Sequence, residues 1–182
     1  MHKSLQVAII LATSALSTAS LCYADEAYFK SQKAGISLRK PANWIFDSKK
    51  DSSNGTVVVI LRHKEPYSDL NPTCRVTVSS GSTATTNLRH EVDAQIASMQ
   101  KSFPDLALVE SPAEIAIGTV NGIGCKLKYS FAHEGKLVKV LWRMWHVSRP
   151  GRSLKIVMAG PQEGPEISET EFRAIRESIT IE

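Results

Sequence analysis

The sequence predicts an α+β protein in which two helices cover a mainly antiparallel β-sheet. Several segments alternate apolar and polar residues, which is the period of a strand with one buried face. Most connections between them have hairpin length, so neighbouring strands should run antiparallel. Only two segments, 88–103 and 168–179, repeat apolar residues at helical spacing. A strand that is apolar on both faces needs cover on both sides, which favours a layered arrangement of helices and sheet.

Residues 1–24 have the pattern of a secretory signal peptide. Lys3 provides the positive start, and Leu5–Leu21 is uncharged but too short to indicate a spanning helix. Small residues at Cys22 and Ala24 precede Asp25, which predicts cleavage near Ala24. The residue before Cys22 is leucine, which argues against lipidation. We therefore expect a periplasmic or secreted protein without a transmembrane segment in the mature chain.

The mature chain is expected to form one domain. Residues 25–34 are polar and are predicted to be a flexible N-terminal tail, and residues 35–182 are long enough for a single domain with its own core. The formal net charge of the whole sequence is +4. This excess is too small to suggest a nucleic-acid partner, which export makes less fitting still.

The first half of the domain should consist of strands followed by one helix. Short strands are expected at 35–41 and 43–46, an interior strand at 56–62, and an alternating strand at 74–79. A helix should follow and end before Pro104. Its apolar stripe is Leu88, Val92, Ile96, Met99 and Phe103.

The second half should be a run of antiparallel strands closed by a helix. Strands are expected at 106–110 and 114–120, with Asn121-Gly122 as a hairpin turn. A long hairpin within 120–147 should turn through a five-residue loop, Ala132–Lys136. The last long strand is expected at 153–159. A capping-box sequence, Ser168–Glu171, then predicts the start of the closing helix. The apolar side of that helix is Phe172, Ile175 and Ile179.

The return strand of the long hairpin is expected to have one core face and one mixed face. The core face carries Val138, Val140, Trp142 and Met144. The mixed face carries Lys139, Leu141, Arg143, Trp145 and Val147. This alternation places every second residue on the same side of the sheet.

The mixed face is the candidate binding surface. Between Lys126 and Lys155 the sequence has eight basic residues and one acid. Register permitting, Lys126, Lys128, Lys139, Arg143 and Trp145 would form one basic surface with an exposed tryptophan. Such a surface suits an acidic protein partner, an anionic lipid headgroup or a glycan. The alternative is an ordinary solvated sheet face, or a face covered by a helix through lysine stems.

Two cysteines remain after the signal peptide, Cys74 and Cys125. Disulfides persist outside the cytoplasm, so a Cys74–Cys125 bond is one interpretation. The other is a pair of buried free thiols that act as small apolar residues.

No catalytic, metal-binding or cofactor motif is evident. The histidines of the mature chain are scattered, without H-x-H or H-E-x-x-H spacing, and no serine lies in G-x-S-x-G. We therefore expect no metal, no cofactor and no enzymatic activity. A hydrolase with an unrecognised site stays as a distant alternative.

The order of segments resembles the PsbP-like superfamily, and within it the bacterial DcrB-like envelope proteins. The resemblance rests on the strand start Gly35–Pro41 with Trp44 three residues after the proline, the helix after 74–79, the long hairpin, and the closing helix. It covers about Gly35 to Ile181. It implies an α-β-α sandwich around an antiparallel sheet, but it carries over no functional residue.

The resemblance also implies a non-enzymatic role, because members of this superfamily bind and stabilise other proteins. The first hypothesis is therefore an exported binding, adaptor or assembly factor of the cell envelope, whose partner is another envelope or secreted protein. The alternative is a secreted, virulence-type protein that binds an anionic ligand or lipid. An enclosed apolar cavity would favour that alternative, and a flat or grooved surface without a pocket would favour the first hypothesis. A polar pocket with a histidine or carboxylate of perturbed pKa would favour a hydrolase.

Overall fold

The computed structural model describes residues 27–51, 55–65, 70–80, 87–117, 120–162 and 167–181. Its main layer is a seven-stranded antiparallel sheet with the order β3-β4-β5-β9-β8-β7-β6. The strands are β3 (Trp44–Asp51), β4 (Thr56–His63), β5 (Thr73–Ser80), β6 (Ala107–Ile117), β7 (Val120–His133), β8 (Lys136–Arg149) and β9 (Arg152–Pro161). The predicted α+β class is confirmed. The predicted signal peptide lies outside the described residues.

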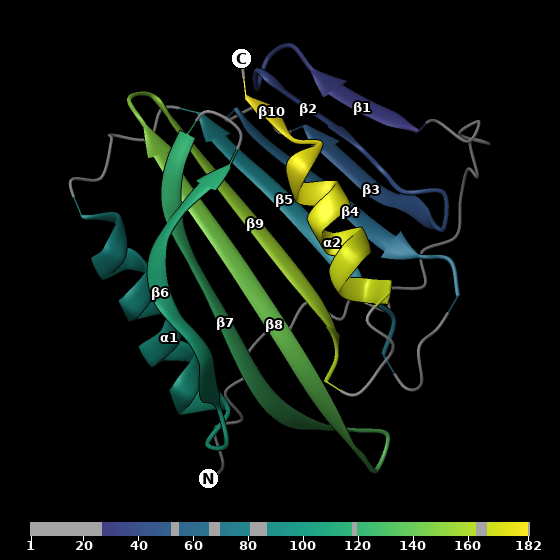
Figure 1. Ribbon diagram of the computed structural model, residues 1–182, viewed down its shortest axis with the longest axis vertical. Coiled ribbons are helices and arrows are strands. Elements are labelled where there is room, and N and C mark those ends of the chain that lie inside the picture. Colours follow the sequence, from purple (N-terminus) through teal and green to yellow (C-terminus); the bar gives the residue numbers. More distant parts are fainter. Residues whose placement is uncertain are drawn as a thin grey trace, which may run out of the picture.

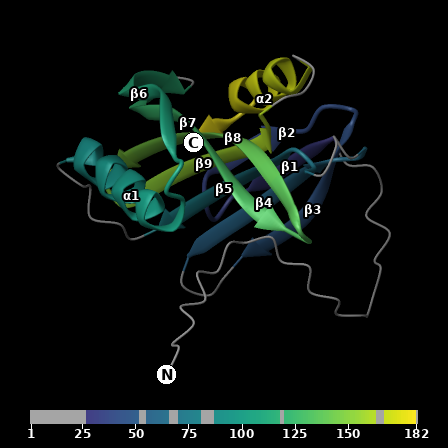
Figure 2. The same ribbon diagram turned by 90° about the horizontal axis from the view of Figure 1, so that it is seen from below.

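The two helices lie on opposite faces of this sheet (Figures 1 and 2). Helix α1 (Leu88–Ser102) buries Val92 and Ile96 among side chains of β7 and β8. Helix α2 (Ile167–Glu177) buries Phe172 and Ile175 against the other face. The α-β-α layering implied by the family resemblance is therefore present, and the sheet separates two apolar clusters.

The two faces of β8 are divided as the alternation predicts. Its core face is buried against α1 through Val138, Val140, Trp142 and Met144. The neighbouring positions Trp145 and Val147 belong to the cluster on the α2 side. Strand β8 is therefore covered on both sides over much of its length, which explains why both of its faces carry large apolar residues.

The turn between β7 and β8 is shorter than predicted. His133 pairs with Lys136, so the loop consists of Glu134 and Gly135 alone. Both have positive φ, 50° and 76°. Two successive positive φ values are the mark of a type I′ hairpin turn, which suits the twist of the flanking strands. The expected five-residue loop is wrong because its outer residues continue the ladder.

Strand β6 replaces two shorter predicted strands. The pairing of β6 with β7 shifts register between Leu108 and Glu110 and again between Glu110 and Ala113. The strand bends at these irregularities without ending. The predicted turn at Asn121-Gly122 is also wrong, because both residues pair with β6. A side chain at Gly122 would place its Cβ 2.5 Å from the carbonyl oxygen of His146, so glycine is required there by close packing.

A small second sheet closes one end of the domain. It has the order β1-β2-β10 and consists of β1 (Tyr28–Ser31), β2 (Ile36–Arg39) and β10 (Thr180–Ile181). Residues 28–31 were assigned above to the flexible tail 25–34, and this assignment is wrong for them. Phe29 anchors the segment, because its ring packs on Phe46 with centroids 6.3 Å apart.

The interpretation of the cysteines as a disulfide is also wrong. Cys74 on β5 belongs to the cluster on the α2 side, and Cys125 on β7 belongs to the cluster on the α1 side. Strands β9 and β8 lie between them, which corresponds to about 14 Å at the usual strand spacing. A disulfide requires Cα atoms within about 7 Å. Both are buried free thiols, and burial raises the pKa of each, for Cys125 to about 11.

Candidate functional site

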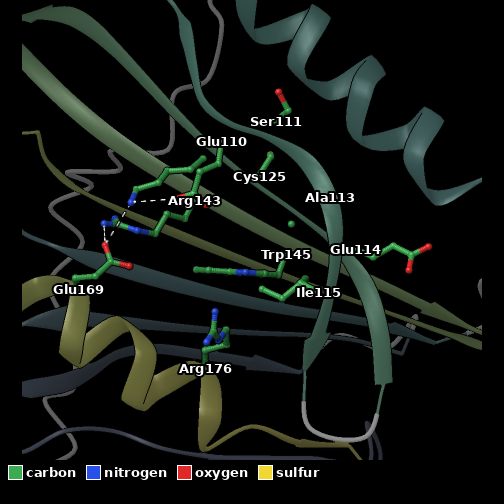
Figure 3. A pocket seen from close by; sticks show the side chains of 12 residues that line it. Glu110, Ser111, Ala113, Glu114, Ile115, Cys125, Arg143, Trp145, Glu169 and Arg176 are labelled. Atoms are coloured by element: carbon green, nitrogen blue, oxygen red, sulfur yellow. Dashed lines mark hydrogen bonds and ion pairs between the residues drawn. The ribbon is translucent and has the colours of Figure 1, made fainter.

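A groove runs between β6 and α2, and strands β7 and β8 form its floor. The groove has a volume of about 370 Å³. Figure 2 shows β6 and α2 standing on the same side of the sheet. Figure 3 shows the lining side chains, among them Glu110 from β6, Arg143 and Trp145 from β8, and Glu169 and Arg176 from α2. We call this the β6–α2 groove.

The register of the hairpin brings the candidate residues onto the side of the sheet that faces this groove. Lys126 lies directly opposite Arg143, and Gly124 lies opposite Trp145. Lys128 and Lys139 occupy the next positions towards the turn, opposite Leu141 and Ser130 respectively. The mixed face of β8 and the basic face of β7 therefore form one surface.

These residues differ greatly in exposure. Lys128 and Lys139 are exposed, whereas Arg143 and Trp145 retain only 4% and 8% of their accessible surface. The prediction that Trp145 is exposed is therefore wrong. The Arg176 guanidinium lies 5.4 Å from the centre of the Trp145 ring, so α2 covers this part of the face. Helix α2 therefore covers the mixed face of β8 around Trp145, as the alternative of a helix-covered face expects. The part of this face nearer the β7–β8 turn is exposed.

Arg143 is a buried cation held from two directions. Its Nη2 donates a hydrogen bond to Oε2 of Glu169 on α2. Its guanidinium carbon lies 5.1 Å from the centre of the Phe172 ring, a cation–π distance. Its Nε is buried and has no hydrogen-bond partner. A buried donor without a partner is costly, so the orientation of this side chain is imposed by its surroundings.

Glu169 is shared between two cations. The Nζ of Lys126 lies 3.8 Å from the same Oε2 that accepts from Arg143. Lys126 also lies 3.4 Å from Oε1 of Glu110 on β6, so it bridges the two walls of the groove. Around Arg143 and Lys126 the predicted basic surface is thus a mixed-charge groove. It holds three cations and three carboxylates, namely Lys126, Arg143, Arg176, Glu110, Glu114 and Glu169.

A second polar cluster fixes α2 in place and was not anticipated from the sequence. Trp44 Nε1 donates to Oε2 of Glu171 at 2.9 Å, and His63 Nε2 lies 3.5 Å from the same oxygen. The Trp44 and His63 rings meet edge to face with centroids 5.6 Å apart. Glu171 was assigned above to a capping box, but its carboxylate joins α2 to β3 and β4. This connection sets the position of Glu169 two residues earlier.

The described part of the chain contains no group of three or more His, Cys, Asp or Glu side chains that could hold a metal ion. The buried histidines lie apart, His63 near α2 and His146 within 3.5 Å of Glu91 on α1. Among the described residues that line the β6–α2 groove there is no histidine.

The class of protein that these features define is an α+β domain with an antiparallel sheet between two helices and a charged groove on one face. No protein-family model matches the chain, and no curated protein sequence matches it. Solved structures do match. LpqN of Mycobacterium tuberculosis, described as involved in cell envelope biogenesis, has 17% identity and a TM-score of 0.56, with 80% of this chain and 82% of that chain covered.

The cyanobacterial PsbP protein of Synechocystis, CyanoP, is similar with 11% identity and a TM-score of 0.57, and the match covers 92% of this chain and 99% of that one. A protein of Bacteroides thetaiotaomicron matches with 14% identity and a TM-score of 0.52 over 87% of this chain. The chain spans about half, 49%, of the length of that protein. The chain has a PsbP-like fold. Within the described residues, no helix is long and apolar enough to span a membrane.

Proposed function

We propose that this chain is an exported, non-enzymatic protein of the cell envelope that binds another protein in the β6–α2 groove and acts in assembly or as an adaptor. The observation that carries the proposal is the buried Arg143 on the floor of the groove, with the exposed Lys128 and Lys139 beside the groove on the same face of the sheet. A fixed cation in the groove gives specificity, and exposed cations beside it attract an acidic partner from solution.

The shape and the chemistry of the groove favour a polypeptide over an apolar ligand. Glu110 and Glu169, on its two walls, have side chains that are 67% and 45% exposed, so the groove opens to solvent. Its lining combines carboxylates, cations and short apolar patches. Protein interfaces combine a core enriched in tryptophan and arginine with a polar rim, whereas sites for small apolar ligands are enclosed and mostly hydrophobic.

The comparisons support the location and the kind of role. LpqN, which shares the fold, is described as involved in cell envelope biogenesis. The sequence-based expectation of a signal peptide agrees with a place in the envelope. An envelope protein without a recognisable catalytic constellation is more simply explained as a binding factor.

The test is capture from an envelope extract of the source organism with the immobilised chain and two variants. The first variant, Lys128→Glu with Lys139→Glu, reverses the charge of the two exposed lysines beside the groove. The control, Lys50→Glu with Lys101→Glu, makes the same charge change at exposed positions on β3 and α1. Arg143 is left unchanged, because reversing a buried charge would unfold the domain.

The proposal predicts that the wild type and the control capture the same protein and that the groove variant loses it. Raising the salt concentration should also weaken capture, because exposed charges are screened beyond about 8 Å at physiological ionic strength. Equal capture by all three chains would show that the groove is not the binding surface.

A further inference from the structure

We infer that the β6–α2 groove recognises a carboxylate side chain of an extended acidic segment in the partner, and that Glu169 occupies the carboxylate position until the partner replaces it. The inference rests on the proposed function and names the chemistry of the partner. Its basis is the pairing of Arg143 with Glu169 (Figure 3), the contact of Lys126 with the same carboxylate, and the exposed Lys128 and Lys139 farther along the same face of the sheet.

Arg143 has unused capacity for an anion. Its residue is 96% buried, and its Nε donor has no hydrogen-bond partner although it lies in a groove-lining side chain. The contact with Glu169 uses Nη2 and a single carboxylate oxygen. An arginine fork binds a carboxylate best through two parallel hydrogen bonds, so the present contact leaves part of the fork unused.

Glu169 is suited to being displaced. Its side chain is 45% exposed, whereas that of Arg143 is 5% exposed. It lies in the first turn of α2, where its carboxylate can turn outward to water and still interact favourably with the helix N-terminus. The outward position therefore costs the Glu169 carboxylate itself little, and the cost of the move falls on Arg143. The cation that it leaves would be desolvated and unpaired, and an incoming carboxylate would restore the pair.

Arg143 itself cannot follow Glu169 outward. Phe172 lies against its guanidinium, and Arg176 stands over the adjacent Trp145 ring. Helix α2 is in turn anchored to β3 through Glu171 and Trp44. The cation is therefore prepositioned, which reduces the ordering cost when a ligand binds.

The lysines on the floor of the sheet define the form of the partner. Lys126 and Lys128 are two residues apart on one face of β7, a repeat of about 6.7 Å. Lys139 extends the same surface on β8, opposite Ser130. An extended polypeptide repeats its side chains at the same interval, so acidic residues at alternate positions would each meet a cation. This match favours a peptide segment over a compact anion.

The test measures binding of two labelled nine-residue peptides by fluorescence anisotropy at low salt. One alternates glutamate with threonine, and the other has glutamine in place of each glutamate. The chains compared are the wild type, Glu169→Gln, Lys126→Met and the control Asp93→Asn. Asp93 is half exposed on α1, across the sheet from the groove, and its substitution removes the same charge as Glu169→Gln.

The wild type should bind the glutamate peptide at least fivefold more tightly than the glutamine peptide. Glu169→Gln should bind it at least a further fivefold more tightly, and Asp93→Asn should stay within twofold of the wild type. Lys126→Met should bind at least fivefold more weakly. This last variant keeps the test decisive if Glu169→Gln proves unstable, which circular dichroism would reveal. A Glu169→Gln affinity equal to that of Asp93→Asn would overturn the inference.

Two competitors separate other anions from the peptide. Displacement of the peptide by inorganic phosphate at millimolar concentration would indicate a small-anion site and would overturn the inference. Binding of phosphatidylglycerol vesicles without binding of the glutamate peptide would overturn it in favour of a membrane surface. If the glutamate peptide does not bind but capture from the envelope still depends on Lys128 and Lys139, only the carboxylate inference is contradicted. If the peptide does not bind and capture is also independent of these lysines, the proposed function is contradicted as well.

Discussion

Truncation of Trp142 tests the packing of the strand that carries the groove floor. Trp142 retains 6% of its accessible surface and lies in the cluster beneath α1. A buried indole removes about 200 Å² from water, worth about 5 kcal/mol at about 25 cal/mol per Å². Alanine recovers a small part of this, so Trp142→Ala should lower the free energy of unfolding by about 4 kcal/mol, within the range measured for aromatic truncations.

The assay is urea unfolding followed by far-ultraviolet circular dichroism, with Leu137→Ala as the control on the same strand. Leu137 is 68% exposed, so its truncation should cost less than about 0.5 kcal/mol. With a slope of about 2 kcal/mol per molar urea, the midpoint of Trp142→Ala should fall by about 2 M. A loss below about 1 kcal/mol would mean that Trp142 does not face the core, and the face of Arg143 would then be misassigned too.

Three further outcomes follow from close contacts and buried groups. Gly122→Ala should destabilise the fold by about 1–3 kcal/mol in the same unfolding assay, because its Cβ would meet backbone, whereas Gly160→Ala, with ordinary contact distances, should cost much less. Cys74 and Cys125 should both be alkylated only after unfolding, as peptide mapping would show, and recovery of a disulfide between them would contradict the strand order. Burial lowers the pKa of His146, so the unfolded chain binds more protons as the pH falls below about 6.5, and stability present above that pH should decrease on acidification. His146→Gln should weaken this dependence in melting curves recorded at pH 7 and pH 5, and an unchanged dependence would show that another group causes it.

The alternation of β7 and β8 was sufficient to predict which residues share a face. A strand repeats every two residues, so Trp142 and Arg143 had to point in opposite directions whatever the tertiary structure. The pairing of Lys126 with Arg143 depends on the turn. The turn proved to be two residues long, and a register shift by one residue would have moved one face to the other side.

The burial of Arg143 could not be predicted in this way. It depends on α2, which packs over the sheet from a distant part of the sequence and supplies Glu169 and Phe172. The connection of α2 through Glu171 and Trp44 is likewise a long-range contact, which no local pattern reveals. A basic residue between Trp142 and Met144, in the otherwise apolar run Val140–Trp145, was the available signal that Arg143 is buried and paired.

The dependence on long-range contacts also explains why the interpretation of the two cysteines as a disulfide was wrong. Each one begins an alternating apolar segment, so the burial of both could be predicted. Which face each segment presents depends on the strand order, in which β9 and β8 separate β5 from β7. Sequence spacing holds no information on that order.

The central claim is that Arg143 on the floor of the β6–α2 groove receives a carboxylate of the partner. The most direct measurement is a nuclear magnetic resonance titration of the Arg143 Nε–H and the tryptophan indole N–H signals with the alternating glutamate peptide. We predict saturable shifts for Arg143 and Trp145, and none for Trp142, which faces the other side of the sheet. Saturable binding that leaves the Arg143 signal unchanged would contradict the account.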